Sequence, residues 1–370
     1  MKQRILPALW LLFLLGVASA QVAPGQIDAI FTSLKSSNAP GAAVLVVEHG
    51  KPVFRRGYGV TDLRTHSPID SRTDFRLASF TKQFTATCIM LLVHDGKLHY
   101  DDPLTEIFPQ FPEYGKVITI RNLLNHTSGL PDYEDLLMKQ YPNTPEDKIP
   151  QILDAGVLKL LEQQTAGQFP PGSRWQYSNS GYAVLAMIVE KVSGESFGRF
   201  LDGRIFAPLK MNHTLAYERG KNEVPHRAYG HTKQPDGSWR ETDQSPTSAV
   251  LGDGGIYTST DDLEKWDRAL REHTLISEAE MQAALTPVQP TGGSTDFQSG
   301  KPVSYGFGWF LDPYLGHRRM HHNGETVGFR TTIQRFPDDN LTIIVLANRA
   351  DADPEALALK VADLYFQKKP

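Results

Sequence analysis

The sequence predicts an α/β protein of the α+β type, in which segments from both ends of the chain build one antiparallel sheet flanked by helices. Strand-like apolar runs separated by turn residues gather near the N-terminus and again near the C-terminus. The long stretch between them is mostly helical and rich in loops. Because a lone hairpin is only marginally stable, the most economical arrangement pairs the strands of both ends in one sheet, with a mostly helical part inserted.

The N-terminal part of this sheet begins with a short amphipathic helix. Its apolar residues recur at helical spacing: Ile27, Ile30, Phe31 and Leu34. Two strands are predicted next, at 42–47 and 52–60, joined by the turn His49-Gly50. The segment therefore reads as a helix followed by a hairpin.

The C-terminal part contains four further strand-like runs, separated by turn residues: 305–311, 317–322, 329–336 and 341–347. A terminal helix follows, with apolar residues from Leu357 to Tyr365 on one face. We expect this helix and the N-terminal one to pack on the sheet.

The middle of the chain contains two well-marked helices, at 81–94 and 181–192. Each ends at a glycine, Gly96 or Gly194, which readily takes the left-handed conformation that stops a helix. Three segments rich in Pro, Gly and polar residues predict long surface loops of the kind that shape a substrate site: 132–150, 219–247 and 287–304. We expect one catalytic unit over residues 21–370, with a sheet part at about 26–75 and 300–370 and a helical part at about 76–299.

Residues 1–20 have the pattern of a secretory signal peptide. Lys2 and Arg4 precede an apolar run that ends at Val17, and Ala18-Ser19-Ala20 supplies the small residues that a signal peptidase accepts. The run is shorter than the ~20 residues that span a bilayer. We expect cleavage after Ala20 and a periplasmic or secreted protein that has no membrane span after cleavage.

The composition excludes several classes of protein. The 38 basic and 42 acidic residues are interspersed and leave no basic face for nucleic acid. The single cysteine, Cys88, cannot form an internal disulfide or a cysteine-ligated zinc or iron–sulfur site. The 12 histidines show no metal-ligand spacing. We therefore expect no metal and no cofactor, and a small-molecule or peptide substrate as the binding partner.

The first candidate for chemistry is the motif Ser79-Phe80-Thr81-Lys82. Ser79 falls in the first turn of the predicted helix and Lys82 lies one turn later on the same side, which places a hydroxyl beside an amine. Backbone N–H groups at the helix start suit an oxyanion. Burial would lower the pKa of Lys82 and let it act as a base or proton relay. Taken alone the tetrapeptide is a weak signal, because Ser79 can equally be a helix cap and Lys82 a solvated charge.

Two later segments carry further polar candidates. Tyr177 and Asn179 lie on an irregular run that feeds the helix 181–192, and loops often position functional side chains. In the segment 320–329, His321 and His322 are adjacent, and adjacent residues of a strand face opposite sides. This argues against a pair of histidines on one metal.

Together these three segments resemble the serine hydrolases that include class C β-lactamases, D-alanyl-D-alanine carboxypeptidases, D-aminopeptidases and related esterases. That family carries S-x-x-K, then Y-x-N about a hundred residues later, then K-T-G or H-x-G near the C-terminus. The matches occur here in the same order: Ser79 to Lys82, Tyr177 to Asn179, and His322 to Gly324. Supporting matches lie at 123–131, 254–259 and 305–309, and the resemblance spans roughly residues 42–348.

The resemblance implies a mechanism. Ser79 would attack a carbonyl carbon and form an acyl-enzyme, while Lys82 and Tyr177 share the transfer of its proton. Which of the two is the base is left open by the resemblance. The substrate would be an ester, a D-amino-acid peptide or a β-lactam.

The resemblance also implies substrate-binding roles. The backbone N–H of Ser79 and that of Glu325, which follows Gly324 of the H-x-G motif, would form the oxyanion hole. Asn179 would orient the substrate or the lysine, and His322 would line the opposite wall of the site.

The sequence departs from the β-lactamases in its last motif. There the lysine of K-T-G offers a permanent charge to the substrate carboxylate, whereas His322, with a reference pKa of ~6.5, is only partly cationic at neutral pH. We therefore expect cleavage of an ester, amide or D-amino-acid peptide ahead of efficient β-lactam hydrolysis. The alternatives are a true class C-like β-lactamase and a catalytically silent relative that binds peptidoglycan fragments.

A competing motif is Gly194-Glu195-Ser196-Phe197-Gly198, which matches the G-x-S-x-G elbow of α/β-hydrolases. That elbow needs a strand before the serine, but a helical pattern precedes Ser196. We expect Ser196 to cap a helix. Two other residues have structural interpretations: Cys88 as a small buried hydrophobe, and His126 as a hydrogen-bond partner within its loop.

Overall fold

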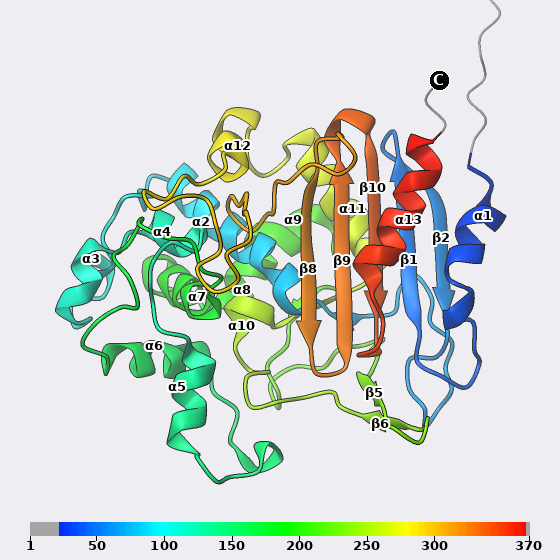
Figure 1. The fold of residues 1–370 in the computed structure, drawn as a ribbon, viewed down its shortest axis with the longest axis horizontal. Helices are drawn as coiled ribbons and strands as arrows, with labels where there is room; N and C mark the ends of the chain where they lie inside the picture. Colours follow the sequence, from blue (N-terminus) through cyan, green and yellow to red (C-terminus); the bar gives the residue numbers. More distant parts are fainter. Residues whose placement is uncertain (1–21, 368–370) are drawn as a thin grey trace, which may run out of the picture.

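The computed structural model describes residues 22–367, so the predicted signal peptide at 1–20 lies outside the described residues. Its largest sheet has five antiparallel strands in the order β2-β1-β10-β9-β8 (Figure 1). Smaller sheets pair β3-β7-β4 and β5-β6. The strands are β1 (Ala42–Glu48), β2 (Lys51–Tyr58), β3 (Phe75–Arg76), β4 (Leu215–Ala216), β5 (His231–Lys233), β6 (Trp239–Glu241), β7 (Ile256–Thr258), β8 (Met320–Thr326), β9 (Phe329–Phe336) and β10 (Leu341–Ala347).

Helices cover both faces of the large sheet and extend past its β8 edge (Figure 1). Helices α1 and α13 lie together on one face, while α11 packs against β1 and β10 on the other. The helices are α1 (Pro24–Ile30), α2 (Lys82–His94), α3 (Leu104–Ile107), α4 (Ile120–Leu124), α5 (Tyr133–Gln140), α6 (Asp154–Glu162), α7 (Asn179–Ser193), α8 (Phe197–Leu201), α9 (Ala207–Leu209), α10 (Leu251–Gly254), α11 (Thr260–Glu272), α12 (Glu278–Leu285) and α13 (Pro354–Phe366).

The two faces of the sheet follow directly from alternation along its central strands. In β1, Ala42, Val44 and Val46 pack against the terminal helices, whereas Leu45 and Val47 face the helical part of the chain. β10 alternates in the same way. Because both faces are covered, β1 and β10 are apolar except for Glu48 and Thr342, the pattern of strands buried on both sides.

The predicted fold class is confirmed: an antiparallel sheet that combines N- and C-terminal strands, with helices around it. The first hairpin turns at His49 and Gly50, whose φ angles of 48° and 74° suit a tight two-residue turn. The prediction at 305–311 is wrong, because this segment forms only isolated bridges. Gly308 breaks it: its φ is 76°, and its backbone lies against the backbone of Lys82 and Gln83.

Other boundaries shift in ways that local chemistry explains. Strand β8, at one edge of the large sheet, covers Met320–Thr326 instead of the predicted 317–322. The predicted loop 132–150 contains helix α5, which begins because the carboxylate of Asp132 accepts from the backbone N–H of Glu134 at 2.7 Å. The predicted loop 219–247 contains the short hairpin of β5 and β6.

In the described part of the chain, none of the helices combines the length and the apolar character that crossing a bilayer requires.

The buried centre of β10 provides a test of the packing. Ile344 is fully buried, so Ile344→Ala is expected to lower the free energy of unfolding by about 2–5 kcal/mol, and Ile344→Val by about 0.5–1.5 kcal/mol. Urea denaturation followed by circular dichroism measures both. The matched control is Val117→Ala, because Val117 is 65% exposed and its truncation should change stability by less than about 0.5 kcal/mol. Equal losses at positions 344 and 117 would contradict the predicted core.

Candidate active site

Ser79 lies in a 3-10 turn, Ala78–Thr81, that leads into helix α2. The preceding residue, Ala78, has a φ of 49°, a left-handed conformation that is strained for any residue with a Cβ atom. The neighbouring backbone is held on both sides: the N–H of Leu77 donates to the carbonyl of Ile256 at 2.8 Å, and the hydroxyl of Thr331 donates to the carbonyl of Leu77 at 2.7 Å. The surrounding sheet elements therefore fix the turn that presents Ser79.

The side chain of Lys82 is completely buried and points at Ser79. Its Nζ donates to Ser79 Oγ at 3.0 Å, to Asn179 Oδ1 at 2.8 Å and to the backbone carbonyl of Asp253 at 3.0 Å. Burial lowers the pKa of Lys82 to about 8, although the negative charge of Asp253 and that of Glu134 oppose the shift. The amine is thus held by three hydrogen bonds and gives up its proton more readily than an ordinary lysine.

The three partners of Lys82 determine what happens when it loses a proton. Two of them, the Asn179 amide oxygen and the Asp253 carbonyl, can only accept hydrogen bonds. A neutral amine still has two N–H groups for these two oxygens, and its lone pair then faces Ser79 Oγ, which can reverse its role and donate. The geometry is therefore satisfied both with protonated and with neutral Lys82.

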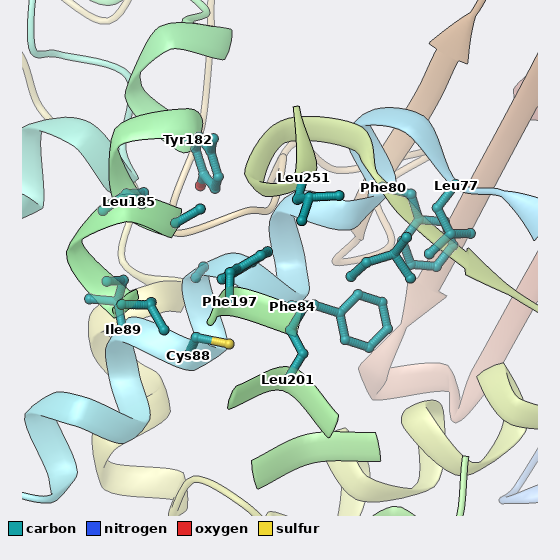
Figure 2. Packing of buried hydrophobic residues seen from close by; sticks show 14 of the residues in the cluster. Leu77, Phe80, Phe84, Cys88, Ile89, Tyr182, Leu185, Phe197, Leu201 and Leu251 are labelled. Carbon is teal, nitrogen blue, oxygen red and sulfur yellow. The ribbon is translucent and has the colours of Figure 1, made fainter. Parts of the chain in front are cut away.

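Lys82 is buried because helices pack around it. Figure 2 shows buried side chains of α2, α7, α8 and α10 packed together, among them Phe84 and Cys88 of α2, Tyr182 of α7 and Leu251 of α10. These residues belong to one continuous core that keeps water from the lysine stem. Cys88 is fully buried there, and burial raises the pKa of its thiol, as expected for a packing residue.

The ring of Tyr177 also lies close to the Lys82 amine. Its ring centroid is 4.9 Å from Lys82 Nζ, and its hydroxyl is buried without a hydrogen-bond partner of normal geometry among the described residues. Burial raises the pKa of Tyr177 well above its usual value, and the nearby Ser79 hydroxyl opposes this only in part. Tyr177, like His322, does not line the cavity in front of Ser79, so the role of this hydroxyl toward a substrate stays a prediction.

Asn179, predicted on a loop, is the first residue of helix α7. The helix begins there because Ser178 Oγ accepts from the N–H of Gly181 at 3.1 Å. While its oxygen faces Lys82, the Asn179 amide nitrogen donates to Glu134 Oε1 at 3.2 Å. Asn179 therefore connects the lysine to an acidic residue on α5.

Sequence reasoning missed the acidic residues around the lysine. Glu134 has its pKa raised to about 7, first by burial and then by the charges of Asp132 and Asp253. Asp253 is buried, and one of its carboxylate oxygens accepts from the hydroxyl of Tyr133 at 2.9 Å. The capping pattern of Asp132 could have revealed α5, but no local signal marks Asp253, because only the fold brings it to Lys82.

Arg76 anchors the segment that carries Asp253. Its Nε donates to the carbonyl of Gly254 at 3.1 Å and its Nη2 to the carbonyl of Ser248 at 3.0 Å. The side chain is 3% exposed. Arg76 therefore helps to hold the Asp253 carbonyl against the amine.

His322 differs from expectation in both charge and place. It is 2% exposed and does not line the cavity beside Ser79, where we expected it to form the opposite wall. Its Nδ1–H donates to the carbonyl of Asn323 at 2.7 Å, and its Nε2 accepts from the Tyr305 hydroxyl at 3.2 Å. Burial, aided by the charge of Lys82, lowers the pKa of His322 to about 3, so the ring is neutral at physiological pH. His321 turns to the other face and contacts Asp312 at 2.7 Å, as the alternation predicts.

A small cavity of about 60 Å³ opens in front of Ser79. Glu325 lines it together with Ser79 and Asn179, whereas its carboxylate pairs with Arg330 at 2.8 Å. Gly324 lets strand β8 approach this turn, because a Cβ atom there would lie 2.0 Å from the carbonyl oxygen of Leu77. Strand β8 thus runs directly beside the nucleophile turn, and the oxyanion role of the Ser79 and Glu325 N–H groups stays a prediction.

Ser196 of the competing G-x-S-x-G motif has a structural role. Ser196 is exposed, follows helix α7 instead of a strand, and caps α8 by accepting from the N–H of Arg199 at 3.4 Å. His126 is fully buried, and its Nδ1 accepts from the N–H of Ser178 at 3.1 Å. It thus supports the segment that carries Tyr177, with ring centroids 4.4 Å apart.

Comparison with known proteins agrees with this geometry. The family model described as Beta-lactamase matches residues 27–366. Penicillin-binding protein 4* of Bacillus subtilis is 34% identical over 358 residues, which cover 93% of this chain and 76% of that protein. The octameric penicillin-binding protein homologue of Pyrococcus abyssi superposes with a TM-score of 0.80 at 25% identity, over 94% of this chain and 78% of that one. A D-amino acid amidase of Ochrobactrum anthropi has a TM-score of 0.74 at 24% identity, over 93% and 97% of the two chains.

The close approach at Gly324 generates a prediction. In Gly324→Ala the new Cβ atom would overlap both the Leu77 carbonyl and Thr331 Oγ1, which lies 2.3 Å from it, so β8 must move away from the Ser79 turn. We expect the rate of covalent labelling of Ser79 by a fluorophosphonate to fall at least tenfold. Gly203→Ala is the matched control, because a Cβ atom at Gly203 meets nothing within 4 Å. Labelling of Gly324→Ala at the rate of the control would show that the close packing of β8 is not required.

Proposed function

This chain belongs to the β-lactamase family of serine hydrolases, and on that premise we propose that it is an exported hydrolase that cleaves an ester, amide or D-amino-acid peptide bond through an acyl-enzyme on Ser79. The observation that carries the proposal is the buried Lys82 amine, 3.0 Å from Ser79 Oγ, with a pKa lowered to about 8. A nucleophile beside a base of matched pKa is the arrangement that covalent catalysis needs.

In acylation, Ser79 Oγ forms a bond to the carbonyl carbon of the substrate while its proton passes to the neutral Lys82 amine. We assign the base to Lys82 because the raised pKa of Tyr177 makes a phenolate costly at neutral pH. The bond to the departing nitrogen or oxygen then breaks as the Tyr177 hydroxyl gives that atom its proton and takes a proton from the Lys82 ammonium, so that no phenolate is left and the amine is neutral again. Water then attacks the acyl carbon and releases Ser79, with the same groups acting in reverse.

The state of His322 favours esters, amides and peptides over β-lactams. A neutral ring bonded to Tyr305 and to the Asn323 carbonyl offers no charge to a substrate carboxylate. The amidase named above is likewise described by its action on an amino acid amide. A true class C-like β-lactamase is the alternative within this chemistry. A catalytically silent relative that binds peptidoglycan fragments is the alternative without turnover.

The export step is a separate part of the proposal. Residues 1–20 would direct the chain out of the cytoplasm and be removed after Ala20. N-terminal sequencing of the protein from the periplasm or medium of an expressing bacterium should begin at Gln21. Recovery only from the cytoplasm with Met1 intact would contradict export.

A fluorophosphonate probe tests the nucleophile directly. We expect intact-mass analysis to show one adduct on the wild-type protein and none on Ser79→Ala, because the probe needs an activated serine. Ser196→Ala is the matched control and should be labelled like the wild type, since Ser196 only caps α8. Equal labelling of Ser79→Ala would contradict the assignment. Once labelling has identified Ser79, assays of the unlabelled wild type compare the substrate classes with a p-nitrophenyl ester, D-alanyl peptides and a chromogenic cephalosporin.

The pH dependence of acylation tests the base. Lys82 is protonated below its pKa and accepts a proton only above it, so kcat/KM for a p-nitrophenyl ester should rise with pH and level off above about 8. Lys82→Arg should be at least a hundredfold slower, because guanidinium stays protonated. Lys159→Arg, an exposed residue of α6, is the control and should keep the wild-type profile. A rate that is flat between pH 6 and 10 would contradict a lysine base.

A further inference from the structure

The short helix α10 is bonded to the segment that carries the nucleophile. Three of its carbonyl groups accept from side chains of that segment: Gly252 from the hydroxyl of Thr85 at 2.7 Å, Asp253 from the Lys82 amine at 3.0 Å, and Gly254 from Arg76 Nε at 3.1 Å. A Cβ atom at Gly252 would lie 2.3 Å from the carbonyl oxygen of Tyr182, so α10 also lies tightly against α7. The position of α10 therefore decides where the amine finds its backbone acceptor.

Two N–H groups of α10 are bonded to one carboxylate, that of Asp154 at the start of α6. Asp154 Oδ2 accepts from the N–H of Leu251 at 2.8 Å, and Oδ1 accepts from the N–H of Gly252 at 3.0 Å. Both N–H groups belong to the first turn of α10, where no carbonyl of the helix itself can accept from them. Asp154 is 7% exposed and has no ion pair within residues 22–367, so the two N–H groups take the place of water around its carboxylate.

Asp154 is ionised in the pH range in which Lys82 can act as a base. Burial raises the pKa of Asp154 to about 7, although the two N–H bonds lower it, and the charge of Asp253 adds to the rise. Lys82 loses its proton only above about 8, where both oxygens of the ionised Asp154 carboxylate can accept. An amide at position 154 could accept from only one of the two N–H groups, because its nitrogen is a donor.

We propose that Asp154 is a positioning residue of the active site, which holds the N–H groups of α10 and thereby keeps the Asp253 carbonyl on the Lys82 amine. Asp154 does not line the cavity in front of Ser79, so it acts through α10 and does not touch the substrate. This inference rests on the proposed function, because Asp154 affects acylation only if Lys82 is the base.

The titration of Lys82 tests the inference without any substrate. In protein labelled with ¹³C at the lysine ε-carbons, NMR gives the titration midpoint of Lys82 in the wild type and in Asp154→Asn, and the signal is assigned by its absence from Lys82→Arg. The protonated amine depends on the Asp253 carbonyl and on the charge of Asp253 more than the neutral amine does, so a displaced α10 should lower the midpoint. We expect a fall of about one pH unit, the size that one hydrogen bond to a charged group implies.

Other titratable groups also face the Lys82 amine, and the substitution replaces none of them. They are Asp132, Glu134, Asp253, His126, Tyr177, Tyr182 and His322. A changed midpoint in Asp154→Asn therefore reports how α10 is placed.

Two further variants make the test specific. Asp202→Asn is the matched control, because Asp202 is an exposed acid that follows α8, and it should keep the wild-type midpoint. Circular dichroism checks folding. Asp154→Ser, whose hydroxyl can accept from one N–H group, takes the place of Asp154→Asn if that variant does not fold. An unchanged or raised midpoint in the folded variant would overturn the inference.

Fluorophosphonate labelling extends the test to acylation. Above about pH 9 we expect the folded variant to be labelled at least tenfold more slowly than the wild type, because a displaced base loses its alignment with Ser79. Labelling at the wild-type rate would also overturn the inference. The two proposals fail separately: a labelled wild type with an unchanged midpoint in the variant removes only the role of Asp154, and a lowered midpoint without labelling of the wild type removes only the hydrolase.

Discussion

The arrangement depends on one constraint: a lysine amine held without access to water. An ammonium at Lys82 gives up its hydration, and three hydrogen bonds to Ser79, Asn179 and the Asp253 carbonyl replace only part of it. The lowered pKa is the result. Since these partners come from the turn before α2, from α7 and from α10, one amine ties together three segments that are far apart in the sequence, and their packing sets its chemistry.

The large sheet makes this geometry possible. Strands from both ends of the chain bring β8 and β9 beside the turn that carries Ser79. There the Thr331 hydroxyl donates to the Leu77 carbonyl, and Gly324, which has no side chain, lets β8 approach that carbonyl closely. The strained φ of Ala78 persists because its neighbours are held on both sides. A rigid sheet edge on one side and a helical core on the other thus flank the small cavity in front of Ser79.

The sequence predicts features that depend on neighbouring residues and misses those that depend on contacts between distant segments. Apolar periodicity and turn residues predict the strands and the helix after Ser79. The ordered motifs name Ser79, Lys82 and Tyr177 as candidates, and the fold brings the Lys82 amine to Ser79 and within 4.9 Å of the Tyr177 ring centroid. Burial is not local: the neutral state of His322 and the approach of Asp253 depend on residues far apart along the chain, with Lys82 and Asp253 separated by 171 positions. The prediction of a strand at 305–311 failed for the same reason, because the backbone at Gly308 packs against α2, which is distant in the sequence.

The protonation of Lys82 can be measured without any substrate. In protein labelled with ¹³C at the lysine ε-carbons, the Lys82 signal is assigned by its absence from Lys82→Arg and followed by NMR from pH 6 to 11. A titration midpoint of about 8, well below the ordinary lysine value of 10.5, is the result that the buried, proton-accepting amine requires. A midpoint at or above 10.5 would contradict the account, because the amine would then stay charged throughout the working range of the site.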